Sequence, residues 1–310
     1  MHSIVLPGRV FKQYWKYRSL VFLALPGIIF FIIFKYIPIY GVTIAFKSFN
    51  FKQGIIGSPW IGFEHFLRLF GSPDFYIILR NTVWISFLKL LFGFPAPIIL
   101  AILLNEIRSR IFKKTIQTIS YLPYFLSWIV ISGLLVEMLS PSRGVVNYIL
   151  SLFDQESVEF LTNPNWFIAI LVSSNVWRSI GWGSIIYLAS ISNIDTQIYE
   201  AAVVDGAGRF KQILHITIPS LMPVISIMLI LSVGDLLNAG FDQIFNLYNP
   251  LVYDVSDIID TYVYRVGLID LDYSFATAVN LFKNIIAFGL IILTNELLKK
   301  NNEYSIWLGR

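Results

Sequence analysis

The stretch "IYEAAVVDGAGRFKQILHITIP", from Ile198 to Pro219, separates two strongly apolar segments of the chain. It is only modestly apolar itself, with small residues, two acidic residues, two glycines, two basic residues and a closing proline. Glycine and proline favour turns, and charged residues avoid lipid, so we interpret this stretch as a loop between two membrane spans. Its role depends on which side of the membrane it faces.

The composition is that of an integral membrane protein. Of the 310 residues, 56% are hydrophobic and only 14% are charged, whereas about 25% are charged in an ordinary soluble domain. The mean hydropathy of +0.69 agrees with this class. The absence of cysteine excludes disulfides, thiol catalysis and cysteine metal sites. With a net charge of only +4, the composition predicts contact with membrane lipid and not with nucleic acid.

Six stretches are long and apolar enough to cross a membrane, which takes about 20 residues at about 1.5 Å each. They cover approximately residues 20–45, 81–105, 115–139, 166–190, 219–240 and 275–298. The first is too long for a cleaved signal peptide, and no small-residue cleavage site follows it. We therefore expect an all-α integral membrane protein with about six transmembrane helices.

Lysine and arginine residues are distributed unevenly between the two sides of these spans. One side carries thirteen, namely Arg9, Lys12, Lys16, Arg18, Arg108, Arg110, Lys113, Lys114, Arg209, Lys211, Lys299, Lys300 and Arg310. The other side carries five, namely Lys47, Lys52, Arg68, Arg143 and Arg265. Because the richer side is cytoplasmic, both termini and the loop at 195–218 are predicted to be cytoplasmic. The predicted organisation is a cytoplasmic segment at 1–19, a transmembrane domain at 20–298 and a cytoplasmic tail at 299–310.

The loops on the other side have structure of their own. "GFEHFLRLF" at 62–70 is typical of a short amphipathic helix at the membrane interface. The loops around 140–165 and 241–274 mix aromatic and polar residues, which favours small folded caps; plain surface loops are the alternative. Five aspartates of the last loop are interpreted as solvated surface, because no EF-hand spacing accompanies them. They are Asp254, Asp257, Asp260, Asp270 and Asp272. No metal site is predicted.

The polar loop itself has the signals of two short helices. Thr196 to Val204 suits a helix with Asp195 as its N-cap, and "DGAG" at 205–208 breaks that helix. Phe210 to Ile216 suits a second helix, and Pro219 opens the next span. The turn presents a surface with almost no side chains, on which another protein can pack closely; an ordinary re-entrant connector is the alternative. That surface consists of Ala201, Ala202, Gly206 and Ala207.

The loop resembles the EAA loop of the membrane subunits of binding-protein-dependent ATP-binding-cassette importers. The matching features are the Glu-Ala-Ala sequence, Gly206 three residues later, and Ile-x-Ile-Pro at 216–219, where Ile218 replaces the usual leucine. In that family this loop is the coupling helix, which docks in a cleft of the cytoplasmic ATPase. The resemblance implies an ATPase-coupling role for Glu200, Ala201, Ala202, Asp205, Gly206, Ala207 and Gly208.

Other stretches resemble the sugar-importing branch of that family, and within it the permeases for oligosaccharides and polysaccharides. They are "YIPIYGVTIAFKSF" (36–49), "WIGFEHFLRLF" (60–70), "LLNEIRSRIFKKTIQTISYLPYFLSW" (103–128) and "DTYVYRVGL" (260–268). Related maltose-type permeases often have Gly-Gly-Pro in the last outer loop, where this chain has "YNPLVYDVSD" at 248–257, so maltose specificity is not expected. The resemblance implies the type I importer permease fold in a bacterial cell membrane.

The resemblance also implies partners. An extracytoplasmic binding protein delivers the sugar, two cytoplasmic ATPase subunits bind ATP and Mg, and a second, homologous permease completes the path. A heterodimer is usual in this branch, and a homodimer remains open. The chain contains no Gly-rich phosphate loop ending in Gly-Lys-Ser/Thr. We therefore expect a non-enzymatic subunit that binds no cofactor itself.

Polar residues inside the predicted spans are the candidates for a sugar path. A charged residue at a helix centre costs about 2.5–3.5 kcal/mol on insertion scales, so it faces a partner or a cavity. The candidates, grouped by shared helical face, are Asn175, Arg178 and Trp182; Asp235 and Asn238; and Asn280, Lys283 and Asn284. Helix-to-helix hydrogen bonds, or a pair between Arg178 and Asp235, are the alternative. Lys35 and Lys89 are predicted to snorkel or to pair.

Two other classes of protein fit less well. A membrane-embedded enzyme needs a nucleophile with a base, or metal ligands; the chain has only three histidines, His2, His65 and His215, although a Ser/Lys dyad stays open. A secondary transporter needs no cytoplasmic docking loop. Within the importer family, peptides, amino acids and phosphate are the alternative solutes.

Overall fold

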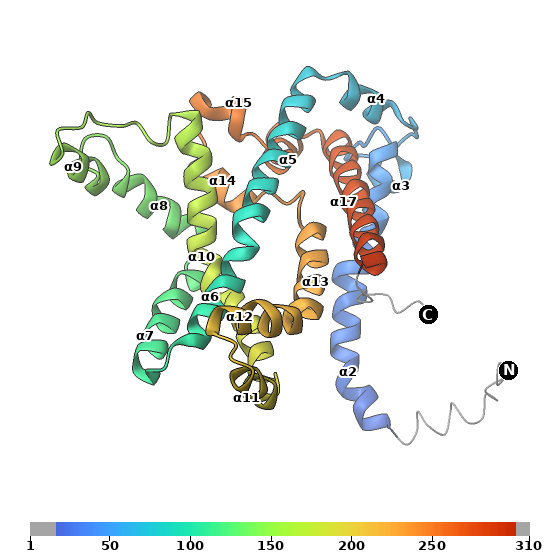
Figure 1. Ribbon diagram of the computed structural model, residues 1–310. Coiled ribbons are helices and arrows are strands. Elements are labelled where there is room, and N and C mark those ends of the chain that lie inside the picture. The colour runs from blue at the N-terminus through green and yellow to red at the C-terminus, as the bar shows by residue number, and fades with distance from the viewer. Residues whose placement is uncertain (1–16, 302–310) are drawn as a thin grey trace.

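The computed structural model describes residues 17–301, with side chains up to residue 298. This part of the chain is almost wholly helical, and the long helices run between two ends of the molecule (Figure 1). The single β-bridge in it joins Lys47 to Trp60. Nearly all of the predicted N-terminal segment and C-terminal tail lies outside the described residues.

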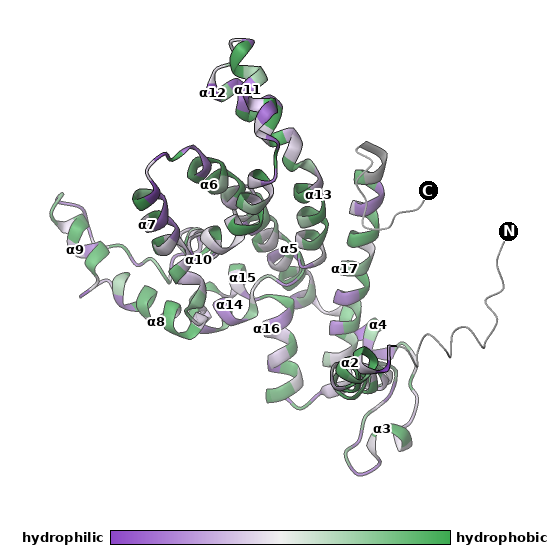
Figure 2. Ribbon diagram, turned by 90° about the horizontal axis from the view of Figure 1, so that it is seen from below, coloured by the Kyte–Doolittle hydropathy of each residue, from purple (hydrophilic) through white to green (hydrophobic). Residues whose placement is uncertain are grey.

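Four helical segments within 17–301 are long and apolar enough to cross a membrane. Each corresponds to one of the predicted spans. They are Arg18–Phe46, formed by α2 (Arg18–Phe31) with a π and a 3₁₀ turn; Pro73–Glu106, formed by α5 (Pro73–Gly93) and α6 (Pro95–Glu106); Arg209–Gly234, formed by α12 (Arg209–Gln212), a π turn and α13 (Ile218–Gly234); and Tyr273–Leu298 of α17 (Tyr273–Asn301). Figure 2 shows mainly apolar residues along α6 and α13.

The predicted span at 115–139 is bent. The helix α7 (Arg110–Tyr121), extended by a 3₁₀ turn to Phe125, meets α8 (Trp128–Met138) at an angle of 103°. Between them, the side chain of Ser127 caps α8 by accepting a hydrogen bond from the backbone N–H of Val130. Counted as one segment, this pair is a fifth candidate span.

The predicted span at 166–190 forms the long helix α10 (Pro164–Ser192). Its 29 residues are ample to cross a membrane, but they include serine, asparagine, arginine and glycine, which keep it out of the set of strongly apolar spans. Asn163 caps its start by accepting from two backbone N–H groups. The helix lies at the centre of the fold and packs on α5, α6 and α7. The prediction of a helix here is confirmed, and this helix is less apolar than the four segments above.

The predicted span at 219–240 is displaced. The helix begins ten residues earlier, at Arg209, and ends at Gly234. Residues 235–240 form a linker instead, which closes at Gly240 with φ +95° before α14 (Phe241–Leu247) begins. Because α13 ends at Gly234, the polar residues at 235 and 238 lie beyond the helix end.

Short helices cover the end of the molecule opposite to the 198–219 loop (Figure 1). The predicted helix at 62–70 is confirmed as α4 (Glu64–Gly71). The predicted caps contain α9 (Val145–Ser151), α14, α15 (Tyr253–Ser256) and α16 (Ile259–Tyr264), together with the small α3 (Gly54–Gly57) of the first loop. These loops are therefore folded caps.

The buried core surrounds α10 and leaves α2 uncovered. One apolar cluster joins Phe167 and Leu171 of α10 to α14, and another joins Tyr187 of α10 to α6 and α13. By contrast, α2 has no buried residue. The core therefore fixes α5, α6, α10, α13 and α14 relative to one another, and these are the elements that build the cavity described below.

Candidate functional site

The first half of the 195–218 loop folds as its residues predict. The helix α11 spans Thr196–Val204, and the Asp195 side chain caps it by accepting from the Gln197 backbone N–H at 2.9 Å. None of the residues of α11 is buried. The loop therefore presents a short, capped helix to the outside of this subunit.

A left-handed glycine ends α11. Gly206 has φ +76°, its backbone N–H donates to the Val203 carbonyl at 3.0 Å, and the Ala207 N–H donates to the Ala202 carbonyl at 2.8 Å. This pair of bonds is the Schellman motif, which satisfies the last carbonyls of a helix and favours glycine at its left-handed position. The predicted break at "DGAG" is confirmed.

The second half of the loop differs from the prediction of a separate helix. From Arg209 the chain continues through α12 and the π turn Ile213–Thr217 into α13, so it is the first part of the fifth span. A hydrogen bond of 2.8 Å joins the Tyr199 hydroxyl to the Thr217 hydroxyl and holds α11 against this helix. Helix periodicity continues through Pro219 because proline is accommodated in the first turn of a helix.

An exposed apolar surface adjoins the small residues of the loop. Val203, Val204 and Phe210 are 60%, 87% and 76% exposed, and Glu200 and Ala201 are exposed beside them. The small residues of this surface were predicted from the sequence, whereas the large apolar ones were not. The available signal was the presence of bulky apolar side chains on both sides of the Gly206 turn, because exposed groups of this kind mark interaction surfaces.

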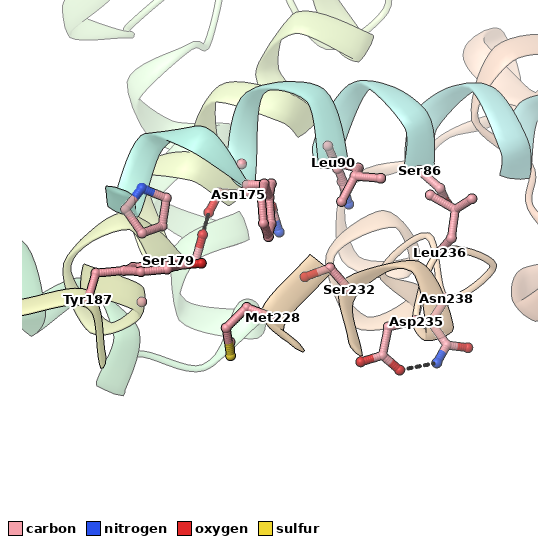
Figure 3. Close-up of a pocket in the computed structure, with 15 residues that line it drawn as sticks. Ser86, Leu90, Asn175, Ser179, Tyr187, Met228, Ser232, Asp235, Leu236 and Asn238 are labelled. Atoms are coloured by element: carbon pink, nitrogen blue, oxygen red, sulfur yellow. Dashed lines mark hydrogen bonds between the residues drawn. The ribbon is translucent and has the colours of Figure 1, made fainter. Parts of the chain in front are cut away.

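A cavity of about 310 Å³ lies between α5, α6, α10 and α13 (Figure 3). It brings together three of the predicted path residues, Asn175, Asp235 and Asn238, from two spans. Its other polar lining groups are Ser86, Lys89, Ser179, Tyr187 and Ser232. Its volume is at the lower end of the range of ligand sites. Amide, hydroxyl and ammonium groups of this kind can bond sugar hydroxyls.

Arg178 and Trp182 share a helix with Asn175 but lie at the bend of the third span. The Arg178 guanidinium donates to the carbonyls of Leu126 at 3.2 Å and Tyr124 at 3.3 Å. The Trp182 ring stacks on the Tyr124 ring, with centroids 4.7 Å apart and planes 5° apart. The predicted face therefore divides: Asn175 lines the cavity, whereas Arg178 and Trp182 hold the bend.

The alternative pair between Arg178 and Asp235 is not among the five ion pairs formed by residues 17–298. Asp235 instead accepts from the Asn238 amide at 3.4 Å. Both side chains lie at one rim of the cavity, joined by the dashed line in Figure 3.

The sixth span contributes a buried lysine. Lys283 forms an ion pair with Asp260 of α16 and donates to the Asn238 amide oxygen at 3.0 Å. Asn280 and Asp260 line a separate cavity of about 440 Å³, and Asn284 is exposed. The predicted residues of this span therefore do not line the first cavity, and Lys283 is a structural link between the outer cap and the 235–240 linker.

Lys89 was predicted to snorkel or to pair, and the structure places it in the cavity. Its ammonium donates to the Ala239 carbonyl at 2.6 Å and to the Gln243 side-chain oxygen. Ser86 lies one turn earlier on α5 and lines the same cavity. The spacing of Ser86, Lys89 and Gly93 along one face of an apolar span was the sequence signal for this lining.

An ion pair orders the cap that contains α15 and α16. Arg265 donates to Asp257 at 2.5 Å. Burial by itself lowers the pKa of the Arg265 guanidinium, but the hydrogen bond and the Coulomb attraction to Asp257 prevail and raise this pKa above its ordinary value. The pair keeps this part of the cap charged and ordered. No group of His, Asp and Glu residues suited to a metal ion occurs within the described chain.

Comparison with known proteins gives consistent results. A family model described as "Binding-protein-dependent transport system inner membrane component" matches residues 93–295. The Polygalacturonan/rhamnogalacturonan transport system permease protein YteP of Bacillus subtilis (strain 168) is 43% identical over 290 residues, which cover 94% of this chain and 90% of that protein.

Two solved structures also match over nearly the whole chain. One is a crystal structure of a bacterial ABC transporter involved in the import of the acidic polysaccharide alginate, with 42% identity, a TM-score of 0.88, and coverage of 95% of this chain and 99% of that chain. The other is a bacterial alginate ABC transporter in complex with an alginate pentasaccharide-bound periplasmic protein, with 41% identity, a TM-score of 0.89, and coverage of 96% and 100%.

Proposed function

The chain belongs to the family of inner membrane components of binding-protein-dependent transport systems, and on this premise we propose that it is a permease subunit of an ATP-driven importer for oligosaccharides. Its relatives import polygalacturonan or rhamnogalacturonan and alginate. Their identity of 42–43% over at least 94% of this chain supports the same class of substrate. Import of a peptide, amino acid or phosphate is therefore not favoured, nor is secondary transport.

The geometry of the 195–218 loop carries the proposal. A capped helix, a left-handed glycine and exposed apolar side chains form a projecting surface at one end of the molecule. Such a surface suits docking into a cleft of an ATPase, since exposed bulky groups at Val203, Val204 and Phe210 can fill pockets while Ala201 allows close approach. The residues proposed for coupling are Glu200, Ala201, Ala202, Asp205, Gly206, Ala207 and Gly208.

Movement of the docked loop has a direct route to the cavity. The loop continues without interruption into α13, which carries Ser232, and the linker after α13 carries Asp235 and Asn238 along the cavity wall. A rigid helix transmits a displacement of its start to its end, so closure of the ATPases around ATP and Mg would move one wall of the cavity. ATP and Mg are bound by the partner subunits in this proposal, and this chain supplies no catalytic residue.

The remaining partners follow from the same proposal. An extracytoplasmic binding protein delivers the sugar to the caps formed by α4, α9, α14 and α16; the alginate transporter was solved with its periplasmic binding protein, which supports this partner. A second, homologous permease supplies the other wall of the path. We place Asn175, Asp235 and Asn238 on this chain's wall, with Arg178 and Trp182 holding the bend beside it.

Purification and reconstitution test this function. The chain should copurify with an ATPase subunit, and the complex in proteoliposomes should take up oligosaccharide only with ATP and loaded binding protein. Loaded binding protein should also stimulate ATP hydrolysis severalfold. Uptake driven by an ion gradient without ATP, or a complex without an ATPase, would contradict the proposal.

A further inference from the structure

One face of α5 presents an unpartnered serine hydroxyl and a lysine ammonium to the cavity. Ser86 is 5% exposed, lines the cavity, and its hydroxyl has no hydrogen-bond partner among the described residues. Lys89 lies three residues later, so the two side chains are neighbours on one helical face. A buried hydroxyl without a partner is costly, since its lost hydrogen bonds to water are not replaced. Its presence therefore points to a ligand.

The charge of Lys89 lacks a compensating carboxylate. Both of its acceptors, the Ala239 carbonyl and the Gln243 amide oxygen, are neutral, and an ammonium has three protons to donate. Lys283 shows the contrast: it binds the same 235–240 linker through Asn238, but it is neutralised by Asp260. Removing a charge from water without an opposite charge is expensive. Of the two lysines, only Lys89 therefore has an uncompensated charge and a free proton with which to bind an anionic ligand.

Asp235 is the other charged residue of the cavity lining, and it does not neutralise Lys89. It is not within the 4.0 Å ion-pair distance of Lys89, is exposed, and accepts from Asn238 at the rim. Figure 3 shows the Asp235 carboxylate directed away from α5. The charge within the cavity, beside Ser86, is therefore positive.

We propose that Lys89 and Ser86 form a carboxylate subsite that recognises an acidic sugar unit of the transported oligosaccharide. The ammonium supplies the charge and its third proton, the Ser86 hydroxyl donates a second hydrogen bond, and Asn175, Ser179 and Ser232 face the sugar hydroxyls. This inference rests on the proposed function and names its substrate as a uronate-containing oligosaccharide.

A pair of substrates that differ only in charge tests the subsite. Trigalacturonate and its fully methyl-esterified form have the same sugar rings, and only the first carries carboxylates. Uptake of each is measured in proteoliposomes containing the full complex, at saturating loaded binding protein, with loading checked separately by calorimetry. In Lys89→Gln the amide can still donate to the Ala239 carbonyl, but the charge is lost. We expect uptake of the acid to fall at least tenfold and uptake of the ester to change less than twofold.

Matched variants distinguish recognition of the substrate's charge by Lys89 from a role of Lys89 in the stability of the subunit. Lys35→Gln removes an exposed lysine of the first span and should change neither uptake. Lys89→Arg should keep most of the preference for the acid. In Lys89→Gln combined with Asp235→Asn, uptake of the acid should stay low, because Asp235 is not the partner of Lys89. Recovery of acid uptake in that double variant would show a simple buried pair and overturn the proposal.

Ser86→Ala provides an independent test of the subsite if the Lys89→Gln subunit does not assemble into the complex. It removes only an oxygen that has no partner in the protein, so the complex should form at normal yield, with uptake of the acid reduced several-fold and uptake of the ester unchanged. Equal loss of both substrates, or no loss of either, overturns the carboxylate subsite while leaving the importer function intact. A wild-type complex that moves neither sugar, with no ATPase response to loaded binding protein, overturns the proposed function itself.

Discussion

The 195–218 loop and the cavity are built in opposite ways. The loop takes its shape from about twenty consecutive residues: Asp195 caps α11, Gly206 ends it, and the Tyr199 hydroxyl binds Thr217. The cavity is assembled from residues as distant as Ser86 and Asn238, carried by α5, α6, α10 and α13 with its linker. A local site can be read from sequence signals, whereas a site assembled by packing depends on which helix faces meet.

The two regions also respond differently to change. The loop is exposed, so its side chains can be altered with little effect on the subunit's own stability. The cavity is lined by side chains that also bond to the protein, such as Lys89, so its residues combine a structural role with the proposed role in recognition. The four predictions below test this difference, from the largest expected effect to the smallest.

Labelling from outside the cell should give an all-or-none difference between the two ends of the molecule. The chain has no cysteine, so single cysteines report their own position. Ser192→Cys, beside the loop, should resist an impermeant thiol reagent in intact cells, and Asp254→Cys in the outer cap should react; both native residues are exposed. Accessibility after permeabilisation is the control. Reaction of both cysteines from outside would place the loop on the wrong side for coupling.

Replacing Gly206 should uncouple the transporter. A Cβ at this position meets no atom within 4 Å, so the cost of Gly206→Val comes from the backbone, where φ +76° is strained for a β-branched residue. We expect the subunit to reach the membrane and uptake to fall more than tenfold, with ATP hydrolysis no longer stimulated by loaded binding protein.

Gly206→Asn is the matched control, because asparagine tolerates the left-handed conformation. It adds a side chain of similar size and should retain most of the uptake and of the ATPase stimulation. Normal stimulation in Gly206→Val would refute the coupling role of this turn.

Replacing Arg178 should destabilise the subunit, because its guanidinium satisfies two carbonyls at the bend of the third span. A hydrogen bond to a charged group is worth about 1.5–3 kcal/mol, so Arg178→Ala should lower the thermal midpoint of the purified complex and its yield. Arg178→Lys should restore part of the loss, since it keeps the charge but not the planar fork. Rescue of Arg178→Ala by Asp235→Asn would instead show a pair that forms in another conformation.

Removing the cap of α11 should have the smallest effect. Asp195→Ala leaves the Gln197 N–H to water and costs about 0.5–2 kcal/mol of helix stability. Because docking on the ATPase would restore the helix, uptake should fall no more than about threefold, with the stability of the subunit unchanged. Asp195→Ser is the control, as serine also caps helices. A loss as large as that of Gly206→Val would mean that the loop is not preformed.

Sequence signals were sufficient wherever a few neighbouring residues set the conformation. They identified α4, the bounds of α11 and its break, because capping residues, glycine and amphipathic periodicity act locally. They misplaced the fifth span, because Pro219 was read as a helix start. Proline is compatible with the first turn of α13 even though a helix precedes it, and the helix ends at Gly234, before the polar linker at 235–240.

The predicted path residues show the limit of prediction from the spacing of residues along one helix. Helical spacing placed Asn175, Arg178 and Trp182 on one face, and the packing of α10 against two different neighbours then divided them between the cavity and the bend. Lys89 was assigned to snorkelling or pairing, because spacing along one helix does not show which other spans surround it. Its neutral partners come from residues 239 and 243.

The sequence by itself determined the class of the protein, its helical character and the helix α11 with its glycine break, since composition, hydrophobic length and capping are properties of the chain that hold before it folds. Only the tertiary structure decided that Ser86 and Lys89 face a cavity together with Asn175, Ser232 and Asp235. The physical reason is that the free energy of a buried polar group depends on the partners that packing brings within hydrogen-bond distance. Those partners lie up to about 150 residues away along the chain.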